Sequence, residues 1–460
     1  MNLPVDFITR TKPLLGKEWD SFIAALNADS PTSIRINKRK YGEGLDLSTV
    51  PWNSNGYYLD KRPQFTFDPL FHAGCYYVQE ASSMFIEQAM KQYVKEDIKI
   101  LDLCAAPGGK SILIADTMSG KSLLVSNEVI RSRANILSEN IAKWGNPNVV
   151  VANNDPAQIG KLTGFFDIIL VDAPCSGEGM FRKDEGAISE WSVDNVKLCK
   201  ERQQRILADI WAALKSGGFL LYSTCTYNMD ENEGNVQWIR DELGAEVLPL
   251  EIDDEWNITP SFVEGIPAYR FFPHKTKGEG FFCALLRKSG EEDHPTQRKK
   301  DEKGKKAKLD LPLEYKNYIR EKERFVFYPK DDKWYAFPAD LQNERAILSS
   351  RLNIVSEGIL MGEFKGKDFI PSQSLALSNY LNVNAFTSCE IDWKTAVAYL
   401  RKEALVLDSQ PKGYILLTYQ GKPLGFVKNI GNRANNLYPQ EWRIRSGNVP
   451  DNEVNVIRSY

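Results

Sequence analysis

Short apolar runs alternate with amphipathic segments from Lys99 to about Lys288. The apolar runs are IKILDL, SLLVSNEV, NVVVANND, FDIILVDA and GGFLLYSTC. The segments between them have helical periodicity, and the longest, NVKLCKERQQRILADIWAALKS, is predicted to end at Gly217 and Gly218. Such alternation is typical of a doubly wound parallel sheet, so the pattern predicts a Rossmann-like α/β fold.

The flanking segments have a different pattern. AYRFFPHKTKGEGFFCALLRK is predicted to form two strands joined by a Lys/Gly-rich turn, which adds an antiparallel hairpin to the edge of the sheet. The first 70 residues combine a helical pattern with the strand SIRIN, so a small α+β domain is expected there. Near the end, GYILLTYQGKPLGFVKNI predicts a hairpin that turns at Gly421, Lys422 and Pro423, within a β-rich C-terminal region.

A chain of 460 residues is too long for one ordinary core and should divide into two to four folded domains. Between Ser289 and Asp310 the composition becomes charged and nearly free of large apolar residues, which predicts a linker. The expected parts are an N-terminal RNA-binding domain (1–70), the α/β domain (71–288), the linker (289–310), a C-terminal subdomain (311–391) and a terminal RNA-binding domain (392–460).

Cysteine usage and charge indicate the compartment and the class of partner. The seven cysteines have no disulfide-framework spacing, and no stretch approaches the ~20 apolar residues of a bilayer span. The start lacks a signal-peptide pattern, so we expect a soluble cytoplasmic protein without a membrane partner. The net charge of −3 argues weakly against general coating of nucleic acid. Basic clusters nevertheless occur in SIRINKRK, in RKKDEKGKKAK and at Lys428, Arg433, Arg443 and Arg445.

The loop CAAPGGKS follows the first strand of the α/β domain and opens a helix. Its small residues and glycines let backbone approach a ligand closely. The loop matches neither GxxxxGK[ST] nor GxGxxG, which disfavours a phosphate cradle.

Acidic residues follow the next three strands. Glu128 stands twenty positions after Gly108, where a nucleotide-binding fold places a carboxylate on ribose hydroxyls. Asp155 follows the third strand and Asp172 the fourth. Each acid alone is more often a helix cap or a turn residue, but their recurrence at successive strand ends favours a ligand. An adenosine cofactor without phosphate recognition points to S-adenosylmethionine rather than NAD.

Two cysteines end strands in the same way. Cys175 follows FDIILVDAP and Cys225 follows GGFLLYST, so both are candidates for a nucleophile at the ligand-binding edge. No histidine lies close in sequence to either one, and the residues alone do not choose between them. The remaining cysteines are expected to be packing residues: Cys75, Cys104, Cys199, Cys283 and Cys389.

The motifs LDLCAAPGGKS, VDAPCSGEGMFRKD, STCTYNMDENE and RFFPH…GEGFF together resemble the Sun/Fmu-type RNA cytosine-5 methyltransferases. SIRIN and YYVQEASSM resemble the N-terminal region of that family, and LGFVKNIGNRANNLYPQEWRIR resembles the PUA-like ending of RsmF-like bacterial 16S rRNA methyltransferases. The resemblance implies a Rossmann-like S-adenosylmethionine-dependent methyltransferase domain followed by a β-rich PUA-like RNA-binding region.

The resemblance also implies roles for the site residues. Cys225 is the implied attacking thiolate, Cys175 assists release of the methylated base, and Asp172 contacts the cytosine edge near N3. Lys110 has two interpretations, a fixed positive charge in the cleft or a solvated helix residue, and we expect the latter. No metal is expected. The expected cofactor-binding residues are Cys104, Ala105, Ala106, Pro107, Gly108, Gly109, Lys110, Glu128, Arg133, Asp155 and Asp172.

The resemblance implies an RNA substrate, 16S rRNA or the small ribosomal subunit, and no DNA partner. A cytosine must be unpaired or extruded to expose C5 and C6, and aromatic residues are available for stacking, although each alone is more often a core residue. These are Tyr57, Tyr58, Phe181 and Tyr438. The alternatives are a transfer-RNA cytosine-5 methyltransferase, a non-covalent protein or small-molecule methyltransferase, and a ribosome assembly factor without turnover.

Overall fold

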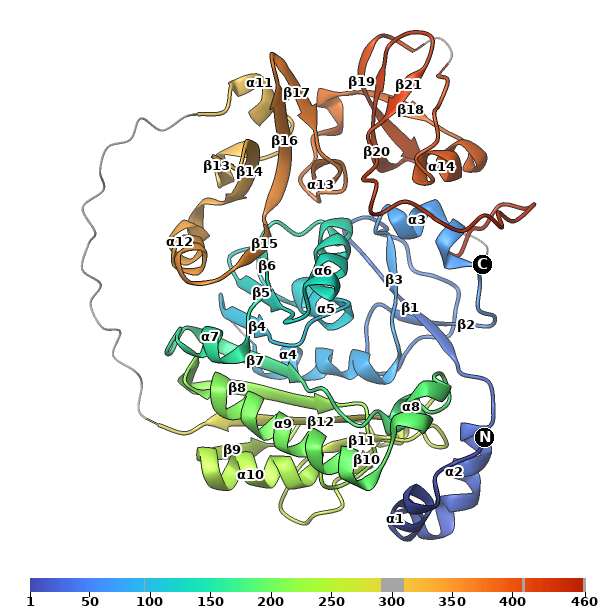
Figure 1. Cartoon of the computed structure of the whole chain (residues 1–460), viewed down its shortest axis with the longest axis vertical. Coiled ribbons are helices and arrows are strands. Elements are labelled where there is room, and N and C mark those ends of the chain that lie inside the picture. The colour runs from blue at the N-terminus through green and yellow to red at the C-terminus, as the bar shows by residue number, and fades with distance from the viewer. Residues whose placement is uncertain (95, 291–309, 408–409, 458–460) are drawn as a thin grey trace.

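The computed structural model describes residues 1–94, 96–290, 310–407 and 410–457. Figure 1 shows the α/β region in the lower and central part, the two N-terminal helices at the lower right and the C-terminal sheets at the top. Except for its ends, the expected linker 289–310 lies outside the described residues, as does the basic cluster of RKKDEKGKKAK.

A sheet of five parallel strands forms the centre, in the order β8-β7-β4-β5-β6. The strands are β4 (Lys99–Asp102), β5 (Leu123–Asn127), β6 (Val149–Ala152), β7 (Phe166–Asp172) and β8 (Leu214–Thr224). The predicted doubly wound α/β fold is therefore confirmed. Since the chain moves outward in opposite directions from β4, the carboxyl end of β4 is the switch point where such sheets bind ligands.

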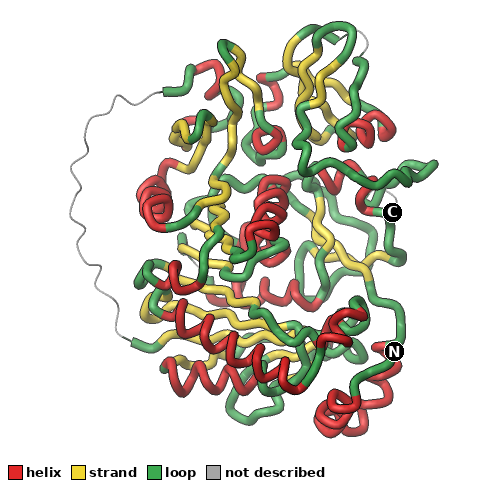
Figure 2. Tube along the Cα trace, in the orientation of Figure 1, coloured by secondary structure: helices red, strands yellow, loops and turns green. Residues whose placement is uncertain are grey.

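Helices cover both faces of this sheet, as Figure 2 shows. One apolar core joins one face to α4 (Ile86–Tyr93), α5 (Gly109–Thr117) and α6 (Arg131–Trp144). A second core joins the other face to α7 (Pro156–Gly160), α9 (Val193–Trp211) and α10 (Glu233–Leu243). The strand residues are buried on both sides, which explains why their sequences are continuous apolar runs.

Antiparallel strands extend the sheet at both ends. Beyond β8 lie β12 (Phe281–Lys288), β11 (Tyr269–Phe271) and β10 (Thr259–Pro260), and β9 (Ala245–Leu248) also pairs with β12. The predicted hairpin is thus present, between β11 and β12. At the opposite end, β15 (Ile354–Glu357) pairs with β6, so the region 311–391 contributes a strand to the large sheet, which the sequence pattern did not predict.

The predicted end of the long helix at Gly217 is wrong. Helix α9 ends at Trp211, and β8 already begins at Leu214. Gly217 has a φ of 74° inside the strand, near the point where the register between β7 and β8 shifts. Gly217 therefore provides the positive φ at an irregularity within β8, and it does not end a helix.

The N-terminal part forms a three-stranded sheet in the order β2-β1-β3. Its strands are β1 (Thr32–Ile36), β2 (Gly56–Leu59) and β3 (Tyr76–Val78), with α3 (Pro69–His72) before the last one. The expected domain boundary at residue 70 falls inside this unit. Helices α1 (Val5–Leu15) and α2 (Trp19–Leu26) lie apart from the sheet and share a core with Phe181, Tyr227 and Phe272 of the α/β domain.

The C-terminal part contains two four-stranded sheets. The first is built from β13 (Phe325–Lys330), β14 (Lys333–Pro338), β16 (Ile359–Lys365) and β17 (Asp368–Pro371), and the second from β18 (Thr387–Glu390), β19 (Gly413–Tyr419), β20 (Lys422–Asn429) and β21 (Ala434–Asn436). The predicted terminal hairpin is confirmed by β19 and β20. The remaining helices are α8 (Glu185–Glu190), α11 (Leu313–Lys316), α12 (Gln342–Arg351), α13 (Gln373–Ala376) and α14 (Trp393–Leu400).

The terminal sheet and the N-terminal sheet share one apolar core, although they stand at opposite ends of the chain. The indole Nε1 of Trp393 donates to the carbonyl of Phe67 at 2.9 Å. Tyr438 Oη lies 3.4 Å from Nδ1 of His72. These contacts bury side chains from both parts, so their relative position depends on the same interior.

Candidate active site

The two candidate cysteines lie side by side at the carboxyl edge of the sheet. Cys175 follows β7 and Cys225 follows β8, and these strands are parallel neighbours with Asp172 opposite Ser223. Their Sγ atoms are 3.1 Å apart, and the backbone N–H of Cys225 lies 3.3 Å from the Sγ of Cys175. Both side chains are partly exposed, so a ligand in the cleft can reach them.

Asp172 ends β7 beside the cysteines and is held by two donors. Its Oδ2 receives a hydrogen bond from Nζ of Lys110 at 2.7 Å, and its Oδ1 receives one from Oγ of Ser223 at 2.7 Å. The Lys110 side chain is only 18% exposed, so the expected solvated helix residue is instead a cleft residue. Burial lowers the pKa of Lys110, but Asp172 outweighs burial and leaves that pKa above its usual value.

The electrostatic setting favours a protonated Cys175. The hydrogen bond with Cys225, followed by burial, raises the pKa of the Cys175 thiol well above its ordinary value. A neutral thiol next to a second sulfur can donate a proton or a hydrogen bond.

A buried carboxylate, Glu231, connects the two cysteine loops. It accepts from the backbone N–H of Ser176 at 3.0 Å, from Nε2 of Gln203 at 2.7 Å and from Nδ2 of Asn228 at 2.8 Å. Ser176 Oγ and Thr226 Oγ1 are 2.9 Å apart, which joins the residues that follow each cysteine. The sequence reasoning missed this network; its only signal was the run of acids and amides in TYNMDENE directly after Cys225.

Glu178 forms a second connection between the loops. Its carboxylate accepts from the backbone N–H groups of Tyr227 and Asn228 at 2.8 Å and from the indole of Trp191 at 2.9 Å. The next residue, Gly179, donates its N–H to the Cys225 carbonyl at 2.9 Å. A Cβ at Gly179 would lie 2.9 Å from that carbonyl oxygen, so only glycine allows the loops to approach this closely.

The loop CAAPGGKS, which is expected to bind the cofactor, lies between β4 and α5 at the switch point. Gly108 has a φ of 118° and caps α5, so the chain turns there in a conformation that favours glycine. The guanidinium of Arg133 donates to the carbonyl of Ala106 at 2.9 Å, and Asn140 donates to the carbonyl of Pro107 at 2.8 Å. The Ala106–Pro107 peptide bond is cis.

Three acidic residues lie around this loop. Asp102 is buried, and burial raises its pKa to about 7. Its Oδ2 receives the Ser111 hydroxyl at 2.6 Å, while its Oδ1 has no partner among the described residues. Glu128 is buried at the end of β5, 3.4 Å from Arg133. Asp102, Glu128 and Asp172 thus lie around this loop, with Asp172 paired to Lys110 and Glu128 to Arg133.

Asp155 acts as a helix cap, as an isolated acid after a strand most often does. Its side chain caps α7 by accepting the backbone N–H of Ala157 at 2.9 Å, and it is exposed. Its role in cofactor binding stays a prediction.

The four aromatic residues considered for stacking on bases all lie in the interior. Tyr57, Tyr58, Phe181 and Tyr438 are between 0% and 8% exposed. Phe181 packs edge-on against Phe7, with ring centroids 5.1 Å apart. They act as core residues in this structure.

Cys75, Cys199 and Cys283 are buried as well, and burial raises the pKa of Cys104.

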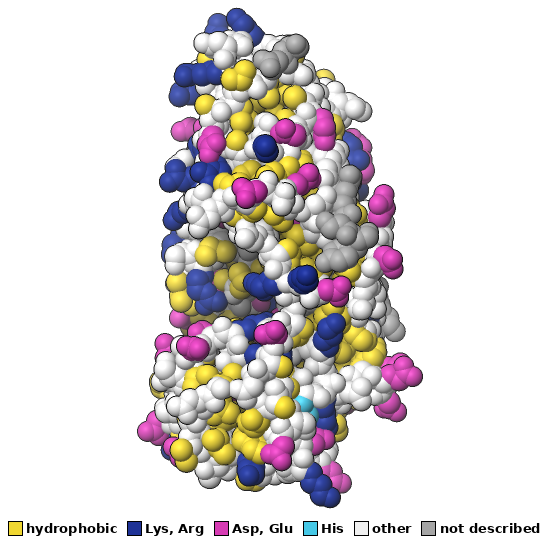
Figure 3. Space-filling view, turned by 90° about the vertical axis from the view of Figure 1, so that its right-hand side faces the viewer, with side chains coloured by type: hydrophobic (Ala, Val, Ile, Leu, Met, Phe, Trp, Pro, Cys, Tyr) yellow, Lys and Arg dark blue, Asp and Glu magenta, His cyan; other side chains and the backbone are white. Residues whose placement is uncertain are grey.

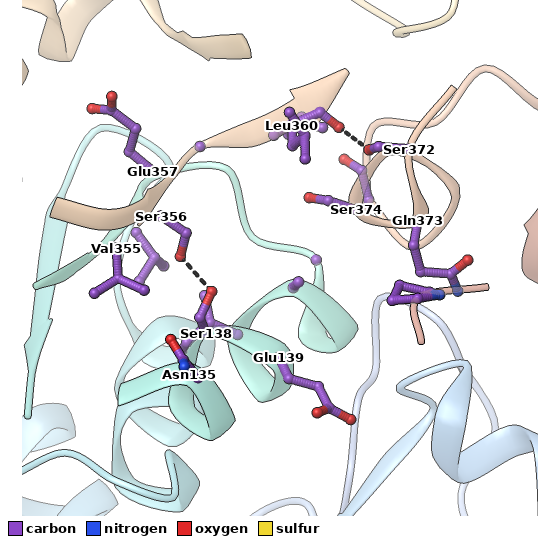
Figure 4. Close-up of a pocket in the computed structure, with 18 of the residues that line it drawn as sticks. Asn135, Ser138, Glu139, Val355, Ser356, Glu357, Leu360, Ser372, Gln373 and Ser374 are labelled. Atoms are coloured by element: carbon purple, nitrogen blue, oxygen red, sulfur yellow. Dashed lines mark hydrogen bonds between the residues drawn. The ribbon is translucent and has the colours of Figure 1, made fainter. Parts of the chain in front are cut away.

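A cavity of about 790 Å³ lies beside α6, and neither cysteine lines it. In Figure 4, Asn135, Ser138 and Glu139 approach it from α6, and Ser356 and Glu357 stand on β15 opposite. Ser138 and Ser356 are hydrogen-bonded across it at 2.7 Å. Its lining mixes two cations with three acids, so its charge alone favours no ligand class.

Among the described residues, no acidic, cysteine or histidine cluster is arranged to hold a metal.

Comparisons with known proteins cover up to 97% of the chain. The family model for 16S rRNA methyltransferase RsmB/F matches residues 89–287, the one for the N-terminal domain of 16S rRNA methyltransferase RsmF matches 3–81, and the methyltransferase RsmF PUA domain matches 386–444. Ribosomal RNA small subunit methyltransferase F of Enterobacter sp. (strain 638) is 30% identical over 478 residues, covering 97% of both chains. The chain belongs to the RsmF family. The relative from Citrobacter koseri has the same identity and coverage.

Solved structures agree with this family. A methyltransferase homologue from Pyrococcus horikoshii is 31% identical, covers 61% of this chain and 94% of its own, and superimposes with a TM-score of 0.53. NSun6 from Pyrococcus horikoshii is 22% identical, covers 63% of this chain and 99% of its own, and has a TM-score of 0.52, which shows the shared fold.

The family confirms three predictions made from the sequence: the resemblance to RsmF-like enzymes, the Rossmann-like fold with a PUA-like ending, and S-adenosylmethionine as cofactor. None of the described helices is long and apolar enough to cross a membrane.

Proposed function

We propose that this methyltransferase modifies C5 of an unpaired cytosine in 16S rRNA through a covalent bond between Cys225 and C6. Family membership supports methylation of small-subunit ribosomal RNA. The observation that carries the cytosine-5 chemistry is the pair of cysteines, with sulfurs 3.1 Å apart beside Asp172. Methylation of an amine, hydroxyl or carboxylate needs no thiol, so a protein or small-molecule methyltransferase would leave this pair without a role.

The first step raises the nucleophilicity of the base. Cytosine C5 is a weak nucleophile, and addition of the Cys225 thiolate to C6 converts the ring into an enamine. The new S–C6 bond pushes electron density toward C5 and N3. Asp172 contacts the base edge near N3 in this proposal, and Lys110 supplies a fixed positive charge 2.7 Å from Asp172.

The remaining steps restore the aromatic ring. Bound S-adenosylmethionine would supply an electrophilic methyl group to C5 and leave as S-adenosylhomocysteine. A base then takes the C5 proton, the C5=C6 double bond re-forms, and the electron pair of the S–C6 bond returns to Cys225 as the thiolate, which releases 5-methylcytosine. Cys175 assists this release in the proposal, because its sulfur lies 3.1 Å from that of Cys225 and can exchange protons close to the adduct.

The substrate must present its base outside a stacked helix. The alternative target is transfer RNA, which offers unpaired cytosines of the same chemistry. A ribosome assembly factor would bind RNA and S-adenosylmethionine but transfer no methyl group. Cytoplasmic location and the absence of DNA as a partner stay predictions.

The decisive experiment compares two variants. Cys175→Ala and Cys225→Ala are each incubated with S-adenosylmethionine and ribosomal RNA, free and in the small subunit, and resolved on denaturing gels. We expect a protein–RNA adduct with Cys175→Ala, because release is slowed, and none with Cys225→Ala. Cys389→Ala, a change in the C-terminal sheet, is the matched control and should behave as the wild type.

The reverse pattern would assign the attack to Cys175. Adducts on transfer RNA alone would move the substrate assignment to that RNA. Methyl transfer without any adduct would overturn the covalent mechanism, and binding of RNA and cofactor without transfer would favour the assembly-factor alternative.

A further inference from the structure

A second cavity, of about 350 Å³, lies where three parts of the chain meet. The turn after β1 contributes Arg39 and Lys40, the segment after α11 contributes Arg320, and the start of β20 contributes Lys422. The segment 376–384 after α13 completes the wall. Neither cysteine loop lines this cavity, so it is separate from the active site.

The lining is strongly cationic. It contains Arg39, Lys40, Arg320 and Lys422 and no acidic residue. Figure 3 shows a different distribution on the face that it displays, where Lys and Arg side chains are interspersed with Asp and Glu. In a chain with a net charge of −3, four cations around one hollow are a local concentration of positive charge rather than an average property.

These cations form no close ion pairs among the described residues, although Arg39 interacts electrostatically with Asp116. Neither Arg39, Lys40, Arg320 nor Lys422 is in an ion pair there. The nearby acids are engaged elsewhere: Glu321 pairs with Arg324 at 2.7 Å.

The second nearby acid is Glu390, which accepts from Gly421 N–H and from Thr418. Cations that line one cavity without a close ion pair repel one another, and an anion bound between them would offset that repulsion.

Backbone carbonyls orient two of the cations. The ammonium of Lys40 donates to the carbonyls of Ala73 at 2.8 Å and Lys143 at 2.5 Å, and an ammonium has a third hydrogen to offer. The guanidinium of Arg320 donates to the carbonyl of Asn379 at 2.7 Å and keeps further N–H donors. Partial burial lowers the pKa of Lys40 to about 7, and a bound anion would restore its full charge.

We infer that this cavity binds a backbone phosphate of the RNA substrate. The inference rests on the proposed RNA methyltransferase function and specifies where that RNA is gripped outside the active site. Arginine and lysine side chains are the usual ligands of RNA phosphates, and phosphate contacts set the register of a nucleic acid without reading its sequence. Because the site unites the N-terminal sheet, the segment after α11 and the terminal hairpin, one phosphate would hold all three against the same RNA.

The test uses a triple variant, Arg39→Gln, Arg320→Gln and Lys422→Gln, in the full chain. Lys40 is left intact because its ammonium holds two backbone carbonyls. We expect the KM for small-subunit RNA to rise about tenfold, with kcat at saturating RNA and the Kd for S-adenosylmethionine unchanged. The salt dependence of RNA binding should weaken, since each lost phosphate contact lowers the slope of log K against log salt by about 0.7 to 0.9.

The control variant is Arg240→Gln, an exposed arginine on α10 that pairs with Asp241 and lies outside the cavity. It should keep the wild-type KM and salt slope. An unchanged KM and slope in the triple variant, while the wild type methylates RNA, would overturn the phosphate site and leave the proposed function intact. No methylation of RNA by the wild type would instead contradict the proposed function.

A free anion is the competing occupant. Inorganic phosphate is therefore titrated into the wild type and the triple variant by calorimetry. Loss of phosphate binding together with a raised KM for RNA supports an RNA phosphate. Loss of phosphate binding with an unchanged KM would assign the cavity to a free anion and overturn the inference.

Discussion

Nζ of Lys110 lies 2.7 Å from Oδ2 of Asp172, although the two residues belong to different elements, one after β4 and one at the end of β7. Lys110 is on the first turn of α5, and Asp172 is the last residue of β7. Because β4 and β7 are parallel neighbours, the loop after β4 and the end of β7 meet at one edge of the sheet. The pair therefore joins the cofactor loop to the cysteine loops.

Removal of the Lys110 charge should slow methyl transfer without loss of the fold. Lys110→Met leaves Asp172 with only the Ser223 donor, and we expect a rate about 10²-fold lower, the scale of a lost electrostatic contact in an active site. Single-turnover transfer of labelled methyl groups measures the effect. Lys110→Arg keeps the charge and should recover part of the rate. A wild-type rate for Lys110→Met would show that the cation has no part in the reaction.

Glu231→Gln should loosen both cysteine loops. A glutamine has one acceptor oxygen and places an NH₂ group against donors that the carboxylate now satisfies. We expect a loss of about 1–3 kcal/mol in the free energy of unfolding and a lower rate of adduct formation. Urea unfolding measures the first quantity and gel assays the second. Glu246→Gln, at an exposed pair with Arg287, is the control, and equal effects in both variants would contradict the supporting role of Glu231.

Gly108→Ala should weaken cofactor binding. The φ of 118° at Gly108 is unfavourable for alanine by about 1–3 kcal/mol, and the added Cβ would lie 3.1 Å from Leu137 Cδ1. We expect a higher Kd for S-adenosylmethionine by calorimetry. Gly217→Ala also places alanine at positive φ, but in a strand irregularity with open space around it. It should lower stability and leave the Kd unchanged; similar Kd values for the two variants would contradict the prediction.

Acid should destabilise the contact between the terminal and N-terminal sheets through His72. Burial lowers the pKa of His72 to about 3, so the folded protein holds this ring neutral while the unfolded chain protonates it near its usual value of 6.5. The stability contribution is complete above pH 6.5 and is lost as the pH falls toward 3. At pH 5 the loss should be about 2 kcal/mol relative to pH 7.

The measurement is the difference in unfolding free energy between the wild type and His72→Gln across this range. Burial raises the pKa of nearby Asp68 to about 6, which has the opposite effect on stability, but Asp68 is present in both proteins and cancels in the difference. A difference that does not change between pH 7 and pH 5 would show that His72 is protonated in the folded state.

Much of the fold and of the site followed from local patterns. Continuous apolar runs predicted the buried parallel strands, because strands covered by helices on both faces need no polar positions. The small residues of CAAPGGKS and the acid twenty positions later indicated the cofactor type, since strand ends in such sheets converge on one edge. Both cysteines were recognised as reactive candidates for the same reason.

The tertiary structure decided what depends on residues distant in the chain. Glu231 accepts a hydrogen bond from Ser176, 55 positions away, and Lys110 pairs with Asp172 instead of facing solvent. Strand β15 pairs with β6. No local periodicity in the sequence indicates any of these pairings. Gly217 shows the same limit, because the sequence pattern indicated a helix end there, while strand pairing places its positive φ inside β8. Local sequence therefore determined the elements and the chemical types at their ends, and packing between distant segments decided which side chains meet.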